Sequence, residues 1–231
     1  QSALYYAKER LQGNSSNSKN KTDPIIVHPE IRKNLLHMKS INEGIRALTL
    51  WVGNQFDIAK LSNDPKEKNN SENIIALMTP ILKSFSSEKG CESANTAIQI
   101  YGGHGYIKDH GIEQLLRDAR ITTIYEGTNG IQALDLIGRK FQFNDGVMYD
   151  NFFKLIKDYL NSISSNTDLK LFLDQFNKSF DELLVTTDYL KTIDKNKIDE
   201  FNGPAVEFLN LFSYVAIGYI WLRLLEVSFR E

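Results

Sequence analysis

The chain has 231 residues, 42% of them hydrophobic and 24% charged, and its net charge at pH 7 is −2. This is the composition of a globular protein with room for one large helical domain, or for one domain and an appendage. A charge so near zero gives no electrostatic basis for binding nucleic acid or an anionic membrane. The one cysteine, Cys91, excludes an internal disulfide framework. We expect it to be buried, in a reducing compartment such as the bacterial cytoplasm, or a mitochondrial-type matrix in a eukaryote.

The N-terminal part of the sequence predicts two helices separated by a loop. The opening stretch, QSALYYAKERLQG, has apolar residues at helical spacing and lacks both an initiator Met and a secretory leader. A polar loop over 13–23 follows it. Pro29 then stands at a favoured helix start, and apolar residues recur every three or four positions to Leu61. We therefore expect one long helix over 29–61.

The next segment predicts a second long helix. The polar stretch SNDPKEKNN is expected to be a loop, after which Ser71 or Asn73 caps a helix that runs to Tyr101. Pro80 lies inside this helix and predicts a kink, because proline removes a backbone donor. GGHGYIKDHG indicates a glycine-rich turn.

Shorter helices are expected after that turn. One covers about 112–120, and another is capped by Thr128 or Asn129 and runs through Arg139. A break is expected at QFNDG. Three more amphipathic helices are predicted near 147–164, 168–192 and 203–229.

These elements predict an all-α protein with no strand. We interpret 1–140 as an antiparallel, up-and-down helical bundle and 141–231 as a helical extension, because long helices joined by short loops favour antiparallel neighbours. The run from Phe208 to Leu222 is nearly all apolar, but it is short for a membrane span, so a buried core helix or a subunit contact is expected. The sequence starts and stops inside helical patterns, which indicates a piece of a longer protein.

The histidines and glycines do not form a recognisable metal or nucleotide site. None of the four histidines has HExxH or paired i, i+4 spacing, and one cysteine cannot complete a zinc site, so no metal is expected. GGHGYIKDHG does not fit a dinucleotide-binding loop, since no strand precedes it and Lys108 stands where a glycine is needed. Gly102 and Gly103 would still let another backbone or a ligand approach closely.

The stretch IYEGTNG is the best candidate for chemistry. Glu126 follows Tyr125 and precedes Gly127, which can take a positive φ, and the N–H groups of the next helix start would point back at the turn. A carboxylate that a ligand shields from water has a raised pKa, which suits a general base. The alternative is a carboxylate that only stabilises the helix start through the helix dipole. The local sequence leaves both open.

Three blocks of the sequence carry a family resemblance. In order they are YAKERLQG, QIYGGHGY and RDARITTIYEGTNGIQ. Through them, residues 1–140 resemble the C-terminal helical domain of the FAD-dependent acyl-CoA dehydrogenases. The extension, which ends in FLNLFSYVAIGYIWLRLLE, resembles the extra C-terminal region of a bacterial subgroup that includes the methylmercaptopropionyl-CoA dehydrogenases.

The resemblance implies an activity and a set of site residues. Glu126 would be the catalytic base that removes the α-proton of an acyl-CoA thioester, while the β-hydrogen leaves as hydride to N5 of FAD and trans-2-enoyl-CoA forms. The backbone N–H of Glu126 would be one donor to the thioester carbonyl. Tyr125 and Gly127 would line the thioester end. The residues that match the family's FAD contacts are Arg10, Gln12, His28, Gln99, Gly102, Gly103, Thr128, Asn129 and Gly130.

The resemblance also implies partners. In the family, the residues matched by Gln99, Gly102 and Gly103 reach the FAD of a neighbouring subunit, and the one matched by Arg10 meets its pyrophosphate. A homodimer or homotetramer is therefore expected. Electron-transferring flavoprotein, or a similar acceptor, is the expected redox partner.

The sequence departs from the family in three places. Gln12 precedes Gly13 directly where many members have phenylalanine, and Pro29 replaces a common glutamine, so that amide contact is lost although His28 is retained. The N-terminal helical domain and the middle β-domain of the family are not in this sequence. We therefore expect the isolated chain to be inactive.

Two other functions stay open at this point. One is a flavoprotein with vestigial activity, like the alkylation-response relatives that bind DNA, which the near-neutral charge disfavours. The other is a non-catalytic helical assembly module, which the intact YEGT block around Glu126 disfavours for residues 1–140.

Overall fold

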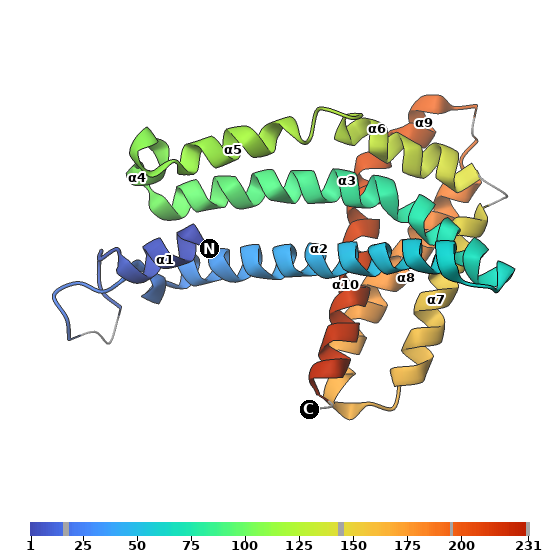
Figure 1. Ribbon diagram of the computed structural model, residues 1–231, viewed down its shortest axis with the longest axis horizontal. Helices are drawn as coiled ribbons and strands as arrows, with labels where there is room; N and C mark the ends of the chain where they lie inside the picture. Colours follow the sequence, from blue (N-terminus) through green and yellow to red (C-terminus); the bar gives the residue numbers. More distant parts are fainter. Residues whose placement is uncertain (16–18, 143–145, 195, 230–231) are drawn as a thin grey trace. The chain divides into compact units, whose positions relative to one another are not determined.

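A computed structural model describes residues 1–15, 19–142, 146–194 and 196–229 (Figure 1). Its regular secondary structure is helical, and the extended pairing within these ranges is an isolated bridge between Leu11 and Pro24. The all-α prediction is confirmed. Residues 143–145, which fall in the predicted QFNDG break, lie outside the described ranges.

The chain divides into two compact units. The first unit contains Gln1–Glu43 and Ser87–Tyr125, and the second contains Gly44–Ser86 and Glu126–Glu231. Two long helices, α2 (Pro29–Leu61) and α3 (Pro65–Tyr101), contribute residues to both. α2 has the bounds that the sequence predicted. These two units do not coincide with the predicted bundle over 1–140 and extension over 141–231, and that interpretation stays a prediction.

The start of α3 corrects the sequence analysis. SNDPKEKNN was expected to be a loop with the cap at Ser71 or Asn73, but the helix begins six residues before Ser71, at Pro65. The side chain of Asp64 accepts a hydrogen bond from the N–H of Lys66 at 2.9 Å. Proline at the first helical position loses nothing, because that N–H has no partner within the helix. α3 continues through Pro80, and the kink stays a prediction.

The first unit is built from short helices around the ends of the two long ones. They are α1 (Ser2–Glu9), a 3₁₀ turn (Ile25–Val27), α4 (Gly103–Tyr106), a second 3₁₀ turn (Lys108–His110) and α5 (Ile112–Ile121). The predicted helix near 112–120 is confirmed, whereas the expected glycine-rich turn is partly helical. The buried core is small and consists of Ala3, Ala7, Ile25, Ala97, Ile100 and Ile112.

Cys91 also lies in the first unit, where it corrects an expectation. It is half-buried, not buried. Burial raises the pKa of its thiol, and the nearby Glu88 carboxylate raises it further.

The second unit holds the larger core. Its elements are α6 (Asn129–Leu134), a π-helical segment (Asp135–Lys140), α7 (Val147–Ile163), a 3₁₀ turn (Thr167–Leu169), α8 (Lys170–Thr192), α9 (Ile198–Asn202) and α10 (Ala205–Ser228). The predicted helix through Arg139 is thus α-helical only to Leu134. Tyr149, Phe152, Phe208 and Phe212 are its largest fully buried side chains.

Helix α10 differs from the prediction in two ways. Its buried residues include 215–217 and 219–220, so it is apolar on all sides and not amphipathic. It is also 24 residues long, so the expectation that this region is too short for a membrane span is wrong. By length and composition, the stretch Ile198–Ser228 could cross a membrane. Of its most apolar window, 56% is buried inside the protein, as in the core helix of a globular unit.

Candidate functional site

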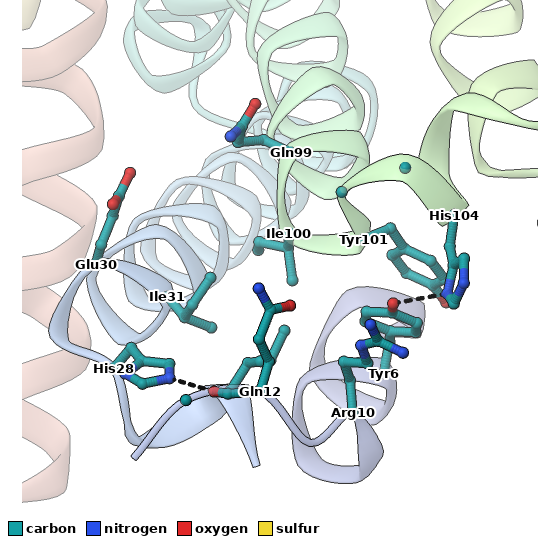
Figure 2. Close-up of a pocket in the computed structure, with 14 residues that line it drawn as sticks. Tyr6, Arg10, Gln12, His28, Glu30, Ile31, Gln99, Ile100, Tyr101 and His104 are labelled. Carbon is teal, nitrogen blue, oxygen red and sulfur yellow. Dashed lines mark hydrogen bonds between the residues drawn. The ribbon is translucent and has the colours of Figure 1, made fainter. Parts of the chain in front are cut away.

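The first unit contains a cavity of about 610 Å³ between the end of α1, the start of α2 and the end of α3 (Figure 2). Fourteen residues line it: Tyr6, Arg10, Gln12, Gly13, Ile25, His28, Glu30, Ile31, Gln99, Ile100, Tyr101, Gly102, Gly103 and His104. Six of these were singled out from separate sequence blocks, namely Arg10, Gln12, His28, Gln99, Gly102 and Gly103. The fold brings all six to one cavity, although their contact with a cofactor stays a prediction.

Backbone bonds hold the segment after α1 in place. Arg10 ends the helix in an extended conformation, and its carbonyl accepts from the N–H of Ile25 at 2.8 Å. The N–H of Gln12 donates to the carbonyl of Asp23 at 2.9 Å. In Figure 2 the side chain of Gln12 points into the cavity. Asp23 and Ile25 therefore fix where the backbone of Arg10 and Gln12 stands.

His28 is tied to this segment. Its Nε2 lies 2.8 Å from the carbonyl oxygen of Gln12 (Figure 2). A carbonyl oxygen can only accept, so Nε2 carries the hydrogen in this contact. A contact between His28 and a cofactor, which stays a prediction, would therefore use ring atoms other than Nε2.

The glycines at the end of α3 leave space at the cavity wall. Gly102 takes φ +60°, and a Cβ added to either Gly102 or Gly103 would meet no atom within 4 Å. The backbone there is open to a close approach by a ligand.

Aromatic residues that the sequence analysis missed complete one wall of the cavity. Tyr6 stacks on Tyr101 with the ring centroids 4.0 Å apart, and its hydroxyl lies 2.8 Å from Nδ1 of His104. The sequence signal for Tyr6 was its position four residues before Arg10, the residue that caps α1, which places both on one side of the helix end.

The second unit contains the turn that begins at Glu126. Glu126 takes φ +54°, and no other non-glycine residue in the described ranges has a positive φ. Gly127 follows at φ +89°, as the sequence predicted. Thr128 is the N-cap of α6, and its Oγ1 accepts from the N–H of Ile131 at 3.4 Å. A glutamate in the left-handed region costs roughly 1–2 kcal/mol.

Side chains from two helices hold this turn. Lys83 of α3 donates through Nζ to the carbonyl oxygen of Gly127 at 2.5 Å and to Oδ1 of Asn129 at 3.2 Å. Nδ2 of Asn129 donates to the carbonyl of Ser84 at 3.2 Å. Nε2 of Gln132 donates to the carbonyl of Glu126 at 3.4 Å. The role of Lys83 could not be predicted from the sequence, since nothing in the TPILKSF run shows which turn its side chain contacts.

The carboxylate of Glu126 is exposed in this chain. The shielding that a general base needs is therefore not supplied by the second unit. In the described ranges, no group of three His, Cys, Asp or Glu side chains is arranged to hold a metal.

Comparison with known proteins decides the family. The profile of the family described as "Acyl-CoA dehydrogenase, C-terminal domain" matches residues 6–141, which is more than half of the chain. The chain belongs to the acyl-CoA dehydrogenase family. A 3-methylmercaptopropionyl-CoA dehydrogenase from Ruegeria pomeroyi is 39% identical over 158 residues. That match covers 68% of this chain and 26% of the relative, so the chain spans about a quarter of that relative's length. The resemblance found in the sequence is confirmed.

Solved structures show the same fold. Caenorhabditis elegans ACDH-11 in complex with C11-CoA matches 94% of this chain and 35% of its own, at a TM-score of 0.76 and 19% identity. An acyl-CoA dehydrogenase from Bacillus anthracis complexed with FAD matches 99% of this chain and 39% of its own, at a TM-score of 0.73 and 20% identity. The predicted bundle of the acyl-CoA dehydrogenase C-terminal domain is thereby confirmed as the fold.

Within this family, the predicted site residues fall into two sets. Those of the first unit line the cavity, except Tyr125, which is exposed and is not among the lining residues. Of the second unit's set, Thr128 caps α6 and Asn129 has its side-chain oxygen and nitrogen bonded to Lys83 and Ser84. Gly130 stands in the first turn of α6, where backbone N–H groups have no partner within the helix. Any contact between Asn129 and a cofactor would therefore use its backbone, the second N–H of its side-chain amide or the second lone pair of its amide oxygen.

Proposed function

We propose that this chain is the C-terminal part of an FAD-dependent acyl-CoA dehydrogenase that converts an acyl-CoA thioester to trans-2-enoyl-CoA. The observation that carries the proposal is Glu126 at φ +54° in the turn before α6. Glycine would take that conformation without steric strain, whereas a glutamate there carries a local penalty. Membership in the family supports a functional reason for it.

In this proposal Glu126 is the base that removes the α-proton. Its carboxylate becomes shielded when the acyl-CoA and other parts of the protein cover the turn, and the loss of water makes it a stronger base. The backbone N–H of Glu126 would donate to the thioester carbonyl and stabilise the negative charge that develops there. Tyr125 and Gly127 would line the thioester end of the substrate.

The first-unit cavity is proposed to bind part of FAD. Arg10 offers a planar fork that suits a pyrophosphate, while Gln12 and Gln99 offer amides. Gly102 and Gly103 supply an open backbone wall, which fits a flat, bulky cofactor. When bound, FAD supplies the acceptor for the β-hydride.

The family resemblance further suggests the setting of the enzyme. If the cavity serves the FAD of a neighbouring subunit, the active form is a homodimer or homotetramer. Electron-transferring flavoprotein or a similar carrier would reoxidise FAD. Bacterial relatives favour the cytoplasm as the compartment.

The test is an anaerobic titration of the full-length, FAD-containing protein with a panel of acyl-CoA thioesters. The panel runs from short to medium linear chains and includes a thioether-bearing chain. We expect at least one thioester to bleach the flavin absorbance, and the most effective one names the substrate class. If FAD is bound but no thioester bleaches it, the vestigial flavoprotein replaces this proposal.

A further inference from the structure

We infer that Lys83 is a positioning residue for the proposed catalytic turn, and that its ammonium group holds Glu126 in its left-handed conformation. This inference rests on the proposed function of Glu126. Lys83 is not placed in contact with substrate or cofactor. It acts through the backbone carbonyl of Gly127 and the side chain of Asn129.

The contacts of Lys83 bracket the turn. Nζ lies 2.5 Å from the carbonyl oxygen of Gly127, one residue after Glu126, and 3.2 Å from Oδ1 of Asn129, the first residue of α6. Both are hydrogen bonds from a charged donor, which are roughly twice as strong as neutral ones. A single ammonium group therefore fixes the peptide between Gly127 and Thr128, one residue beyond Glu126, and also the start of α6.

Such a restraint matters because the backbone at Glu126 is strained, and the bond from Asn129 to the carbonyl of Ser84 holds the start of α6 rather than Glu126 itself. Glu126 has a left-handed backbone conformation, which residues other than glycine disfavour. Gly127 and Gly130 add conformational freedom to the backbone on its C-terminal side. Gln132 donates to the carbonyl of Glu126 at 3.4 Å, which is long for a hydrogen bond. Loss of Lys83 would let the backbone at Glu126 relax toward the negative φ values that most residues adopt. That change would displace both the N–H and the carboxylate of Glu126.

Lys83 can act as an anchor because its own helix is fixed. Its neighbours Ile81 and Phe85 are 0% and 2% exposed in the core of the second unit. Phe85 also meets the ring of Tyr214 on α10 at a centroid distance of 5.1 Å. A site residue is held most precisely by a side chain that stands on a packed helix. Lys83 thus ties the turn to the helical core.

The first test measures flavin reduction in the full-length, FAD-containing protein. Lys83→Met removes both hydrogen bonds but keeps the length of the side chain. We expect the rate constant of flavin reduction at saturating acyl-CoA to fall about tenfold to a hundredfold, with the dissociation constant of the acyl-CoA changed much less. Lys83→Arg keeps the charge and donors and should recover part of the rate. The matched control is Lys66→Met, because Lys66 is exposed on the same helix.

The second test does not depend on activity. Amide hydrogen exchange of residues 126–132 should become about tenfold faster or more in Lys83→Met, because the bonded turn opens more often. Exchange in α8 and α10 should stay as in the wild type. If the wild type fails to reduce FAD at all, the proposed function falls and this measurement still decides the role of Lys83.

Two results would overturn the inference. One is unchanged exchange in residues 126–132 together with an unchanged reduction rate. The other is faster exchange throughout α8 and α10, which would assign Lys83 to the stability of the whole unit. If Lys83→Met does not fold, Lys83→Gln is measured instead, since it keeps a donor but not the charge.

Discussion

Glu126 pays a conformational penalty that a purely structural residue would not need. At φ +54° the side chain crowds its own backbone, whereas glycine at that position would not. A carboxylate that only stabilised the start of α6 could do so from an ordinary conformation. The proposed role, in which the N–H and the carboxylate of Glu126 face the same ligand, would account for this strain.

A stability measurement tests the penalty itself. We expect Glu126→Gly to raise the free energy of unfolding by about 0.5–1 kcal/mol, because the left-handed strain is removed. Glu72→Gly, at an exposed position inside α3, should lower it by about 1 kcal/mol through lost helix propensity. Denaturant unfolding of both variants measures the difference. A Glu126→Gly protein as destabilised as Glu72→Gly would show that the turn is not strained.

At the scale of the residue, the sequence grouped residues that line one cavity, but it did not reveal the contact between Lys83 and the turn at Glu126. Arg10 lies far along the chain from Gln99 and Gly102, yet the motif blocks placed the three in one set and the fold brings them to one cavity. Lys83 stands 44 residues from Gly127, and no spacing rule connects a helix side chain to a turn at that distance. Contacts of this kind follow from packing, which local patterns do not encode.

At the scale of the element, helix bounds followed from the sequence where caps and apolar period agreed. α2 starts at Pro29 and ends at Leu61 as its pattern predicted. The predicted start of α3 was too late, because the polar residues after Asp64 were interpreted as a loop. Asp64 as a cap followed by Pro65 indicates a helix start at Pro65 instead. The π-helical segment Asp135–Lys140 could not be predicted, since its sequence is compatible with an ordinary helix.

The packing of α2 against α10 gives a prediction with a control on the same helix. An alanine Cβ at Gly44 would lie 2.7 Å from Cγ2 of Ile217 and 2.8 Å from Nε1 of Trp221. We expect Gly44→Ala to lower the free energy of unfolding by about 1–3 kcal/mol, since overpacking outweighs the gain in helix propensity.

Gly53 supplies the control. It also lies inside α2, but an added Cβ would meet no atom within 4 Å. Gly53→Ala should raise the free energy of unfolding by up to about 1 kcal/mol. Thermal or urea unfolding compares the two variants, and equal shifts would refute the close contact at Gly44.

At the scale of the whole molecule, each unit holds residues for which a role is proposed. The first unit has an open cavity lined by Arg10 and two amide side chains, and the second has the turn with Glu126. The relatives named above are several times longer than the segment they share with this chain. The shielding of Glu126 is therefore expected from the substrate and from the rest of the protein, and activity is a property to be measured on the full-length enzyme.

The most direct test compares the full-length, FAD-containing wild type with Glu126→Gln and with Glu72→Gln as the control. Each is mixed anaerobically with the thioester that bleaches the wild type. We predict that the wild type and Glu72→Gln bleach alike, while Glu126→Gln binds the thioester and reduces FAD at least about a hundredfold more slowly. Bleaching of Glu126→Gln at the wild-type rate would contradict the account and return Glu126 to the role of a helix-start carboxylate.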